Sequence, residues 1–291
     1  MDVLLTLLGI VVVAVGLWDM FRTLLHPRGQ GPLSSRVLSG VWKASRATGH
    51  RLGSSIGPVG MIASILLWVL LQGLGWALVY LPYVPGGFTY SPGVNPANHP
   101  DPAEALYVSL VTLATLGLGD MVATDPWIRW AIPLQGLTGF ALLTAALTWF
   151  VQVYPPLSRR RSLASELKSL ADVDYADGIG DEDPAAAARV LDGLTAEVAK
   201  ARIDLTQHSE TYYFQESDPG LSLVRQLPYA VDLRDRAGQA SASSVRTSAR
   251  RLGGALEQLA QKLREDFVSA GGSPEEVFAA CAEDHGRDSR R

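Results

Sequence analysis

Cysteine is nearly absent from this sequence, which has Cys281 alone among 291 residues. A single cysteine excludes an intrachain disulfide framework and is typical of a protein in a reducing compartment. We expect Cys281 to be a small buried apolar residue. The chain also lacks a basic excess, since 25 Lys and Arg stand against 29 Asp and Glu. Composition therefore gives no support for nucleic-acid binding.

Charged residues are scarce in the first half of the chain. Residues 1–154 contain 6 of the 29 acidic and 7 of the 25 basic residues, and residues 155–291 contain the other 23 and 18. The second part alone therefore has a net charge of −5. This split predicts a membrane-embedded half followed by an acidic soluble half.

Three apolar stretches are long enough to cross a bilayer, which takes roughly 20 residues. They lie within residues 1–27, 58–82 and 126–154. The N-terminus has neither a basic region nor a clear cleavage site of small residues, so we interpret the first stretch as a retained anchor. The sequence thus predicts three transmembrane helices.

The loop charges predict the orientation of these helices. Segment 28–57 has no acidic residue and five basic ones: Arg28, Arg36, Lys43, Arg46 and Arg51. Short loops rich in Lys and Arg stay in the cytoplasm. We therefore expect an external N-terminus, an extracellular linker at 83–101 and a cytoplasmic domain at 155–291, in a plasma (inner) membrane. Segment 28–57 is either a solvated loop or an interfacial helix with Val37, Val41, Ala44 and Leu52 on one face.

A shorter apolar segment lies between the second and third spans. Residues 102–114 predict a helix of about 20 Å, too short to cross the membrane. Asp101 is a candidate N-cap and Pro102 a candidate first helical residue. The chain must then turn back, and non-helical backbone at membrane depth persists only where it is buried in protein or lines water. Residues 115–120, "TLGLGD", form such a segment, because closely spaced glycines permit non-helical dihedrals.

The segments around this turn resemble the potassium channel superfamily. "TLATLGLGD" at 112–120 resembles its filter signature, and "GLTGFALLTAALTWFV" at 136–151 resembles the inner helix of bacterial two-transmembrane, proton-gated potassium channels. The resemblance implies a homotetramer in which rings of backbone carbonyls replace the hydration shell of K⁺. The implied K⁺-binding residues are Thr115, Leu116, Gly117, Leu118 and Gly119.

The chain departs from the family pattern at Leu118, where an aromatic residue usually stands between the two glycines. Leucine preserves the backbone arrangement but lacks the ring that braces the filter from behind. Some potassium channels carry Gly-Leu-Gly in one of their pore loops. Potassium selectivity and a non-selective or Na⁺-conducting channel of the same fold therefore both remain open.

Several flanking residues have a candidate role in conduction and an alternative role in packing. The Asp120 residues of several chains form a ring at the outer mouth that concentrates cations, or Asp120 bonds to the pore helix; the two roles are compatible. One face of the third span either lines the cavity and gate or packs on neighbouring helices; it comprises Leu137, Phe140, Thr144 and Thr148. Gly136 and Gly139 either permit a gating bend or allow close helix packing. In the first span, Asp19 either has a functional role as an intramembrane carboxylate or pairs with Arg22 at the membrane interface, and we expect the pair.

The C-terminal segment predicts a small helical bundle. Apolar residues alternate at spacings of four and three in two seams: Ala187, Leu191, Leu194, Val198, Ala201 and Leu205, then Val245, Ala249, Leu252, Leu256, Leu259 and Leu263. Asp183 and Ser273 are candidate helix caps, the latter in a capping box with Glu276. The bundle is expected to join subunits or to transmit a signal from an unknown cytosolic ligand, pH change or partner. We find no catalytic or nucleotide-binding motif, so we expect neither an enzyme nor a cofactor.

Together these patterns predict an all-α membrane protein. It has three transmembrane helices, a re-entrant pore helix with a filter loop in a pore domain at 58–154, and a cytosolic helical domain at 155–291. The predicted function is a homotetrameric bacterial K⁺ channel among membrane lipids. A non-conducting membrane receptor or scaffold is the alternative from another class.

Overall fold

The structure is a computed structural model that describes residues 2–25 and 31–286. Arg28, one of the basic residues used to predict orientation, lies outside the described residues. The chain divides into two compact units. We call Met1–Val37 with Met61–Val151 the first unit, and Leu38–Gly60 with Gln152–Arg291 the second unit.

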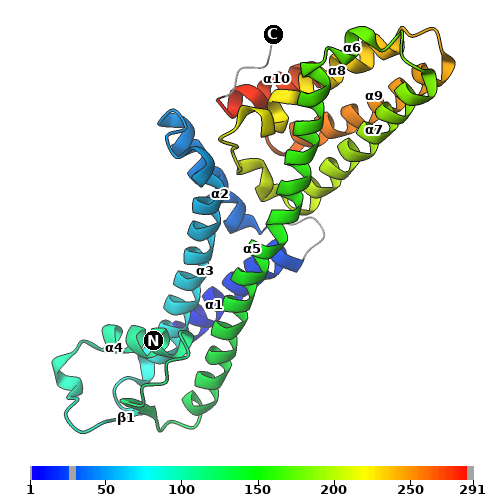
Figure 1. Cartoon of the computed structure of the whole chain (residues 1–291). Helices are drawn as coiled ribbons and strands as arrows, with labels where there is room; N and C mark the ends of the chain where they lie inside the picture. The colour runs from blue at the N-terminus through cyan, green and yellow to red at the C-terminus, as the bar shows by residue number, and fades with distance from the viewer. Residues whose placement is uncertain (1, 26–30, 287–291) are drawn as a thin grey trace. The chain divides into compact units, whose positions relative to one another are not determined.

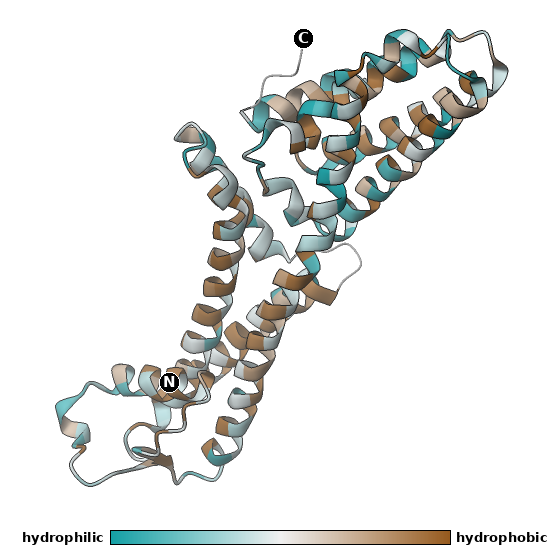
Figure 2. Ribbon diagram, viewed as in Figure 1, coloured by the Kyte–Doolittle hydropathy of each residue, from teal (hydrophilic) through white to brown (hydrophobic). Residues whose placement is uncertain are grey.

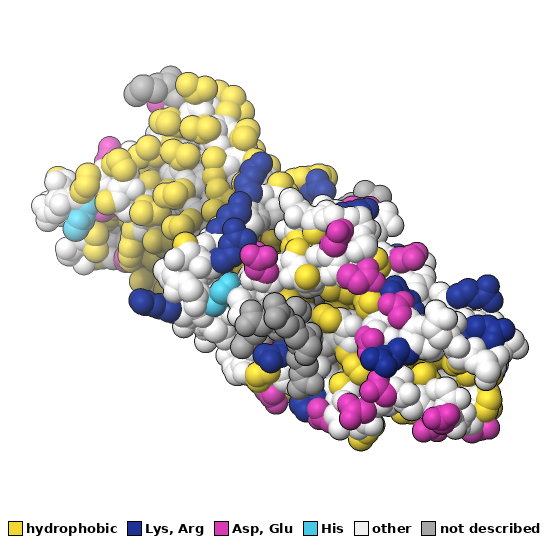
Figure 3. Space-filling model, turned by 90° about the horizontal axis from the view of Figure 1, so that it is seen from above, with side chains coloured by type: hydrophobic (Ala, Val, Ile, Leu, Met, Phe, Trp, Pro, Cys, Tyr) yellow, Lys and Arg dark blue, Asp and Glu magenta, His cyan; other side chains and the backbone are white. Residues whose placement is uncertain are grey.

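Long apolar helices build the first unit (Figures 1 and 2). They are α1 (Asp2–Leu25), α3 (Ile56–Tyr80) and the N-terminal part of α5 (Ile128–Asp172). These three helices are long and apolar enough to cross a membrane, as the sequence predicts. Hydrophobic side chains cover this part of the chain in Figure 3, whereas both signs of charge are interspersed over the rest.

The short elements of the first unit connect α3 to α5. A 3₁₀ turn at Leu81–Tyr83 follows α3, and another forms at Pro96–Asn98. Strand β1 (Phe88–Tyr90) pairs antiparallel with β2 (Met121–Ala123), with Phe88 opposite Ala123. Between the strands lies α4 (Asp101–Leu113), the predicted pore helix shifted by one residue. Its N-cap is Pro100, not Asp101, and no side chain caps it.

Glycines bring α1 and α3 into close contact. A Cβ atom built on Gly9 would lie 2.5 Å from the carbonyl oxygen of Gly75, and one on Gly75 would lie 2.8 Å from the side chain of Val13. The Gln72 side chain adds a bond from Nε2 to the Val13 carbonyl, at 3.1 Å. Small residues at helix interfaces in membranes allow this approach of two backbones.

The carboxylate of Asp19 is buried and joins three helices. It accepts hydrogen bonds from the backbone N–H groups of Leu33 (2.7 Å) and Ser34 (3.1 Å), and from the Ser34 hydroxyl. These donors lie in the first turn of α2 (Pro32–Ala47), where a helix presents free N–H groups. Trp68 Nε1 of α3 donates to the same carboxylate at 2.9 Å. The predicted pairing of Asp19 with Arg22 is therefore wrong, because free N–H donors of α2 satisfy the carboxylate instead.

We expect Asp19→Asn to lower the free energy of unfolding by about 3 kcal/mol. An amide accepts through one atom only, and its NH₂ group would face donors. Unfolding of the purified protein in detergent, followed by circular dichroism, measures the change. Asp2→Asn is the matched control, because Asp2 is exposed and surface substitutions stay within about 0.5 kcal/mol. Equal stability of the two variants would contradict a structural role for Asp19.

The second unit is a helical bundle. It contains the rest of α2 and the part of α5 after Val151. They are joined by α6 (Tyr175–Gly178), α7 (Pro184–Gln207), α8 (Leu223–Gly238), α9 (Ser243–Asp266) and α10 (Pro274–Asp284). Short 3₁₀ turns lie at Gly53–Ser55, Ser209–Tyr213 and Pro219–Leu221. The α9 seam is buried throughout, and the α7 seam is buried except at the half-buried Ala201. Asp183 caps α7, and Ser273 with Glu276 forms the predicted capping box.

Helix α5 continues beyond the predicted end of the inner helix at Tyr154. It passes through Pro155 and Pro156 and ends at Asp172. Each proline removes a helical hydrogen bond, but burial of one face beyond them stabilises the helix. The buried residues of that face are Leu157, Leu163, Ala164 and Leu167.

Segment 32–47 is a helix and not a solvated loop. Its buried residues are Ser34, Leu38, Trp42 and Ser45. Val37, Val41 and Ala44 are not among them and stay the candidate interfacial face, whereas Leu52 lies beyond the end of the helix at Ala47. Within the second unit, Trp42 Nε1 donates to Asp284 Oδ2 at 2.8 Å, and Arg46 bonds the other oxygen at 2.6 Å. A contact with α10 therefore selects which face of α2 is buried. The interfacial location of this helix stays a prediction.

We expect Cys281 to resist thiol reagents in the folded protein. Its side chain is fully buried, as predicted. Burial first, and nearby Asp284 second, raise the pKa of this thiol to about 12, so the reactive thiolate is scarce at neutral pH. Maleimide labelling at pH 7.5 with mass spectrometry should show no adduct before denaturation and complete modification afterwards. Rapid labelling of the folded protein would contradict this expectation.

Candidate functional site

The turn after α4 has an alternating backbone. The φ angles of Thr115, Gly117 and Gly119 are +56°, +55° and +76°, whereas those of Leu116 and Leu118 are not positive. In ordinary extended chain, successive carbonyls point to opposite sides. Alternating the sign of φ rotates every second peptide group, so that successive carbonyls can face one side. This is the geometry that a row of cation-binding oxygens requires.

Hydrogen bonds hold both ends of this turn. At its N-terminal end, the N–H groups of Thr115 and Leu116 donate to the carbonyls of Thr112 and Val111, each at 3.0 Å. At its C-terminal end, Ser91 donates through its N–H to the Asp120 carbonyl (2.8 Å) and through Oγ to the Gly119 carbonyl (3.2 Å). Directly after the turn, β2 begins at Met121 and pairs with β1. The turn is thus fixed between a helix and a sheet.

A buried polar network ties α4 to α3 and α5. Ser109 Oγ donates to the Gly73 carbonyl at 2.7 Å. Gln135 Nε2 donates to the Ser109 carbonyl and to Ser109 Oγ, both at 2.8 Å, and Tyr80 donates to Gln135 Oε1 at 2.7 Å. Ser109, Gln135 and Tyr80 are fully buried. A satisfied network of this kind fixes one arrangement of its helices.

This network was not predicted from the sequence. The available signal was the presence of Ser109 and Gln135 inside apolar stretches, since a polar side chain in a membrane needs a partner. Which residues partner one another depends on how three helices pack, and no local pattern contains that information.

Asp120 bonds to the pore helix. The Tyr107 hydroxyl of α4 donates to Asp120 Oδ2, and the N–H of Met121 donates to Oδ1 at 3.1 Å. The packing role considered for Asp120 is therefore present. The carboxylate is half-buried in the single chain. Its role at an outer mouth stays a prediction.

The predicted filter residues and the predicted cavity face are exposed in the single chain. Leu116 and Leu118 are 64% and 61% exposed. The four predicted cavity residues are exposed as well: Leu137, Phe140, Thr144 and Thr148. Exposed apolar surface of this extent in a membrane protein is available to lipid, to other subunits or to a pore.

The two candidate hinge glycines of α5 have different surroundings. A Cβ atom on Gly139 would lie 2.1 Å from the carbonyl oxygen of Leu113, the last residue of α4. A Cβ atom on Gly136 would meet nothing within 4 Å. Gly139 therefore allows the close approach of α5 to the end of the pore helix.

Comparison with known proteins identifies the same region. A family model described as "Ion channel" matches residues 65–154, which span most of α3, the predicted filter turn and α5 as far as Tyr154. The chain is also 24% identical, over 166 residues, to the uncharacterized membrane protein YdjJ of Bacillus subtilis (strain 168).

That alignment covers 56% of this chain and 48% of YdjJ, so the chain spans about half the length of this relative. No solved structure gave a significant match. In the described residues, no group of three or more His, Cys, Asp or Glu is arranged to hold a metal ion. Residues 65–154 are thus similar to an ion-channel family, which confirms the resemblance of this part of the chain to the potassium channel superfamily.

Proposed function

We propose that four copies of this chain form a potassium-selective channel in a bacterial plasma membrane. Each chain contributes one filter turn, so a closed ring of carbonyls requires several copies around one axis. Four copies of Thr115–Gly119 would place successive oxygen rings along that axis and substitute for the water around K⁺. The alternating φ angles of Thr115, Gly117 and Gly119 carry this proposal.

The pore helix supports cation binding at the same place. Helix α4 ends directly before the filter turn, at Leu113. The C-terminal end of a helix carries partial negative charge, which stabilises a cation in front of it. Asp120, at the other end of the turn, would add negative charge at the outer mouth.

The remaining assignments follow from this arrangement. The N-terminus would lie outside and the C-terminal helices in the cytoplasm, in accord with the basic residues of the α1–α3 connection and of Arg159–Arg161. The face with Leu137, Phe140, Thr144 and Thr148 would line the cavity and the gate, with Gly136 as a possible bending point. The process is passive permeation and requires no catalytic group or cofactor.

A flux experiment tests the proposal. Purified protein, shown by cross-linking to be tetrameric, is reconstituted in liposomes under K⁺ or Na⁺ gradients at several pH values and voltages. We expect K⁺ flux that barium blocks and at least tenfold lower Na⁺ flux. Equal fluxes would show a non-selective channel, for which Leu118 is the first residue to examine. No flux from the tetramer would favour a scaffold, and assembly no larger than a dimer would exclude the carbonyl ring.

A further inference from the structure

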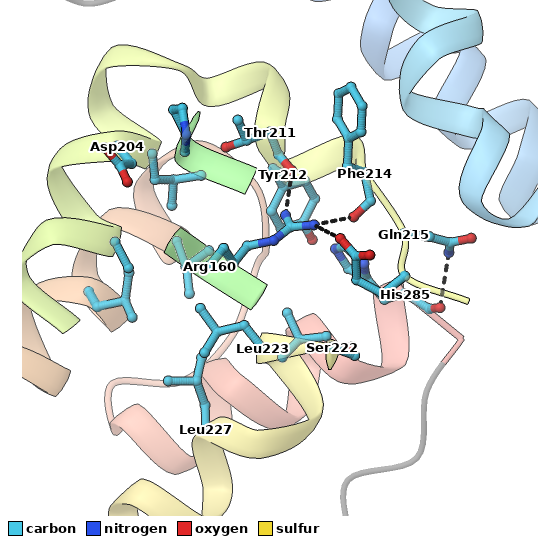
Figure 4. Close-up of a pocket in the computed structure, with 17 residues that line it drawn as sticks. Arg160, Asp204, Thr211, Tyr212, Phe214, Gln215, Ser222, Leu223, Leu227 and His285 are labelled. Atoms are coloured by element: carbon cyan, nitrogen blue, oxygen red, sulfur yellow. Dashed lines mark hydrogen bonds and ion pairs between the residues drawn. The ribbon is translucent and has the colours of Figure 1, made fainter. Parts of the chain in front are cut away.

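The second unit contains a cavity that the channel domain does not use. Helices α5, α7, α8 and α9 surround it, together with the segment that follows α7 (Figure 4). Its volume is about 60 Å³. That space corresponds to roughly four to six waters, or about 120–180 Å³ of liquid. A ligand the size of a small aromatic acid fits this volume.

One side of the cavity is apolar. Figure 4 shows Leu223 and Leu227, two of these residues, beneath the Arg160 side chain. The apolar side is completed by Leu205, Val224, Leu259 and Leu263. Side chains that face empty space lack dispersion contacts on that side, and an apolar ligand body would supply them.

The other side is centred on Arg160 of α5. Its Nη2 donates to the Phe214 carbonyl (2.8 Å) and to Glu216 Oε1 (3.1 Å), and its Nη1 donates to the Thr211 carbonyl. A guanidinium has five N–H donors. The buried Nε–H of Arg160 has no acceptor within the described residues. Arg160 therefore has donor capacity left beside the apolar surface.

The charges around Arg160 do not cancel. Arg159 pairs with Asp204 through two hydrogen bonds, at 2.8 and 2.6 Å. Glu216 is shared by Arg160 and Arg161. Among these five side chains, three guanidinium groups stand against two carboxylates, an excess of one positive charge. Arg159 and Arg161 are 45% and 39% exposed to water, whereas Arg160, which lines the cavity, is 18% exposed. The side chains of Asp204 and Glu216 are 12% and 8% exposed. An excess charge held beside a cavity favours an anion there.

We propose that this cavity binds a small organic monoanion, a carboxylate attached to an apolar body about the size of benzoate. The carboxylate bonds to Arg160 and balances the charge of the cluster. The apolar body lies against the leucines of α7, α8 and α9. The half-buried Arg160 and the adjacent apolar surface together select against both acetate and a neutral isostere.

The position of the site connects binding to conduction. Pro156 and Arg160 line the cavity, and both belong to α5, the helix that contains the proposed gate residues. Occupancy would thus change the packing of the segment that continues the inner helix. This consequence rests on the proposed channel function, whereas binding itself does not.

Calorimetric titration of the full chain in detergent tests the site. Benzoate should bind once per chain with a Kd of about 0.1–1 mM. Benzamide, its neutral isostere, should bind at least tenfold more weakly, and acetate should show no saturable binding. Absence of benzoate binding to folded protein would overturn the proposal, and so would equal affinities for benzoate and benzamide.

Variants locate the site independently of assembly or flux. Arg160→Gln removes the cationic group, and Ala201→Leu fills the cavity from the half-buried Ala201 of α7. Each should weaken benzoate binding at least tenfold. Ala188→Leu, on the same helix but outside the cavity, is the matched control and should bind as the unmodified chain does. Unchanged affinity in Ala201→Leu would place the ligand elsewhere and overturn the assignment.

A flux measurement on the same preparations separates the two proposals. Benzoate should change K⁺ flux in the unmodified chain at least twofold, but not in Ala201→Leu. Binding without any flux in tetrameric protein would contradict the channel function and leave the site standing. Flux without binding would contradict the site and leave the channel function standing.

Discussion

Gly117→Ala should abolish K⁺ flux while leaving the protein folded and tetrameric. Gly117 has a φ of +55° and open space around its Cα, so backbone conformation and not crowding opposes a side chain. Alanine in this left-handed region costs about 1–2 kcal/mol. Four copies would add to about 4–8 kcal/mol in one ring. Rotation of the peptide group relieves that strain and turns its carbonyl away from the axis.

Liposome flux and cross-linking together measure this outcome. Gly40→Ala is the matched control, because Gly40 also meets nothing within 4 Å but has no positive φ. The control should conduct as the unmodified chain does. Normal K⁺ flux through Gly117→Ala tetramers would contradict the role assigned to the alternating backbone.

Thr115 shows where sequence reasoning was incomplete. Glycine readily adopts positive φ angles, so Gly117 and Gly119 indicate an unusual backbone in the sequence itself, and both have positive φ in the structure. Thr115 adopts a φ of +56° without that signal. A non-glycine residue in the left-handed region costs on the order of 1–3 kcal/mol and persists only where its surroundings enforce it. Here the hydrogen bonds of Thr115 and Leu116 to the end of α4 do so.

The elements that were predicted correctly are those whose structure is determined by residues close together in the sequence. Hydrophobic length gives the three spans, and periodicity gives the seams of α7 and α9. The capping box at Ser273 is likewise contained in four consecutive residues. In each case a segment carries its own signal, and tertiary packing reinforces it.

The elements predicted poorly depend on partners far away in the chain. Asp19 has donors 14, 15 and 49 residues away, so its neighbour Arg22 misled the prediction. Burial of Leu157 and Leu163 extends α5 past two prolines that locally indicate an end. Trp42 meets Asp284 across 242 residues, which decides the buried face of α2. The cavity at Arg160 likewise forms only when four helices assemble.

Gly139→Ala should destabilise the pore domain, whereas Gly136→Ala should not. The new Cβ would lie 2.1 Å from the Leu113 carbonyl oxygen and 3.2 Å from Leu113 Cα. These are backbone atoms at the end of α4, so relief requires α4 and α5 to separate. Overpacking of this kind costs about 1–3 kcal/mol per chain. The filter follows α4 directly, so K⁺ flux should fall at least tenfold along with thermal stability.

The pair of variants also distinguishes a bending role from a packing role. Gly136 has open space around it, so Gly136→Ala reduces backbone freedom without introducing a clash. Alanine stabilises a helix by about 1 kcal/mol relative to glycine. If Gly136 serves a gating bend, this variant should reduce flux with unchanged or higher stability. Thermal unfolding and flux of both variants in parallel measure the difference. A Gly139→Ala protein as stable as the unmodified chain would show that the α4–α5 contact does not constrain the filter.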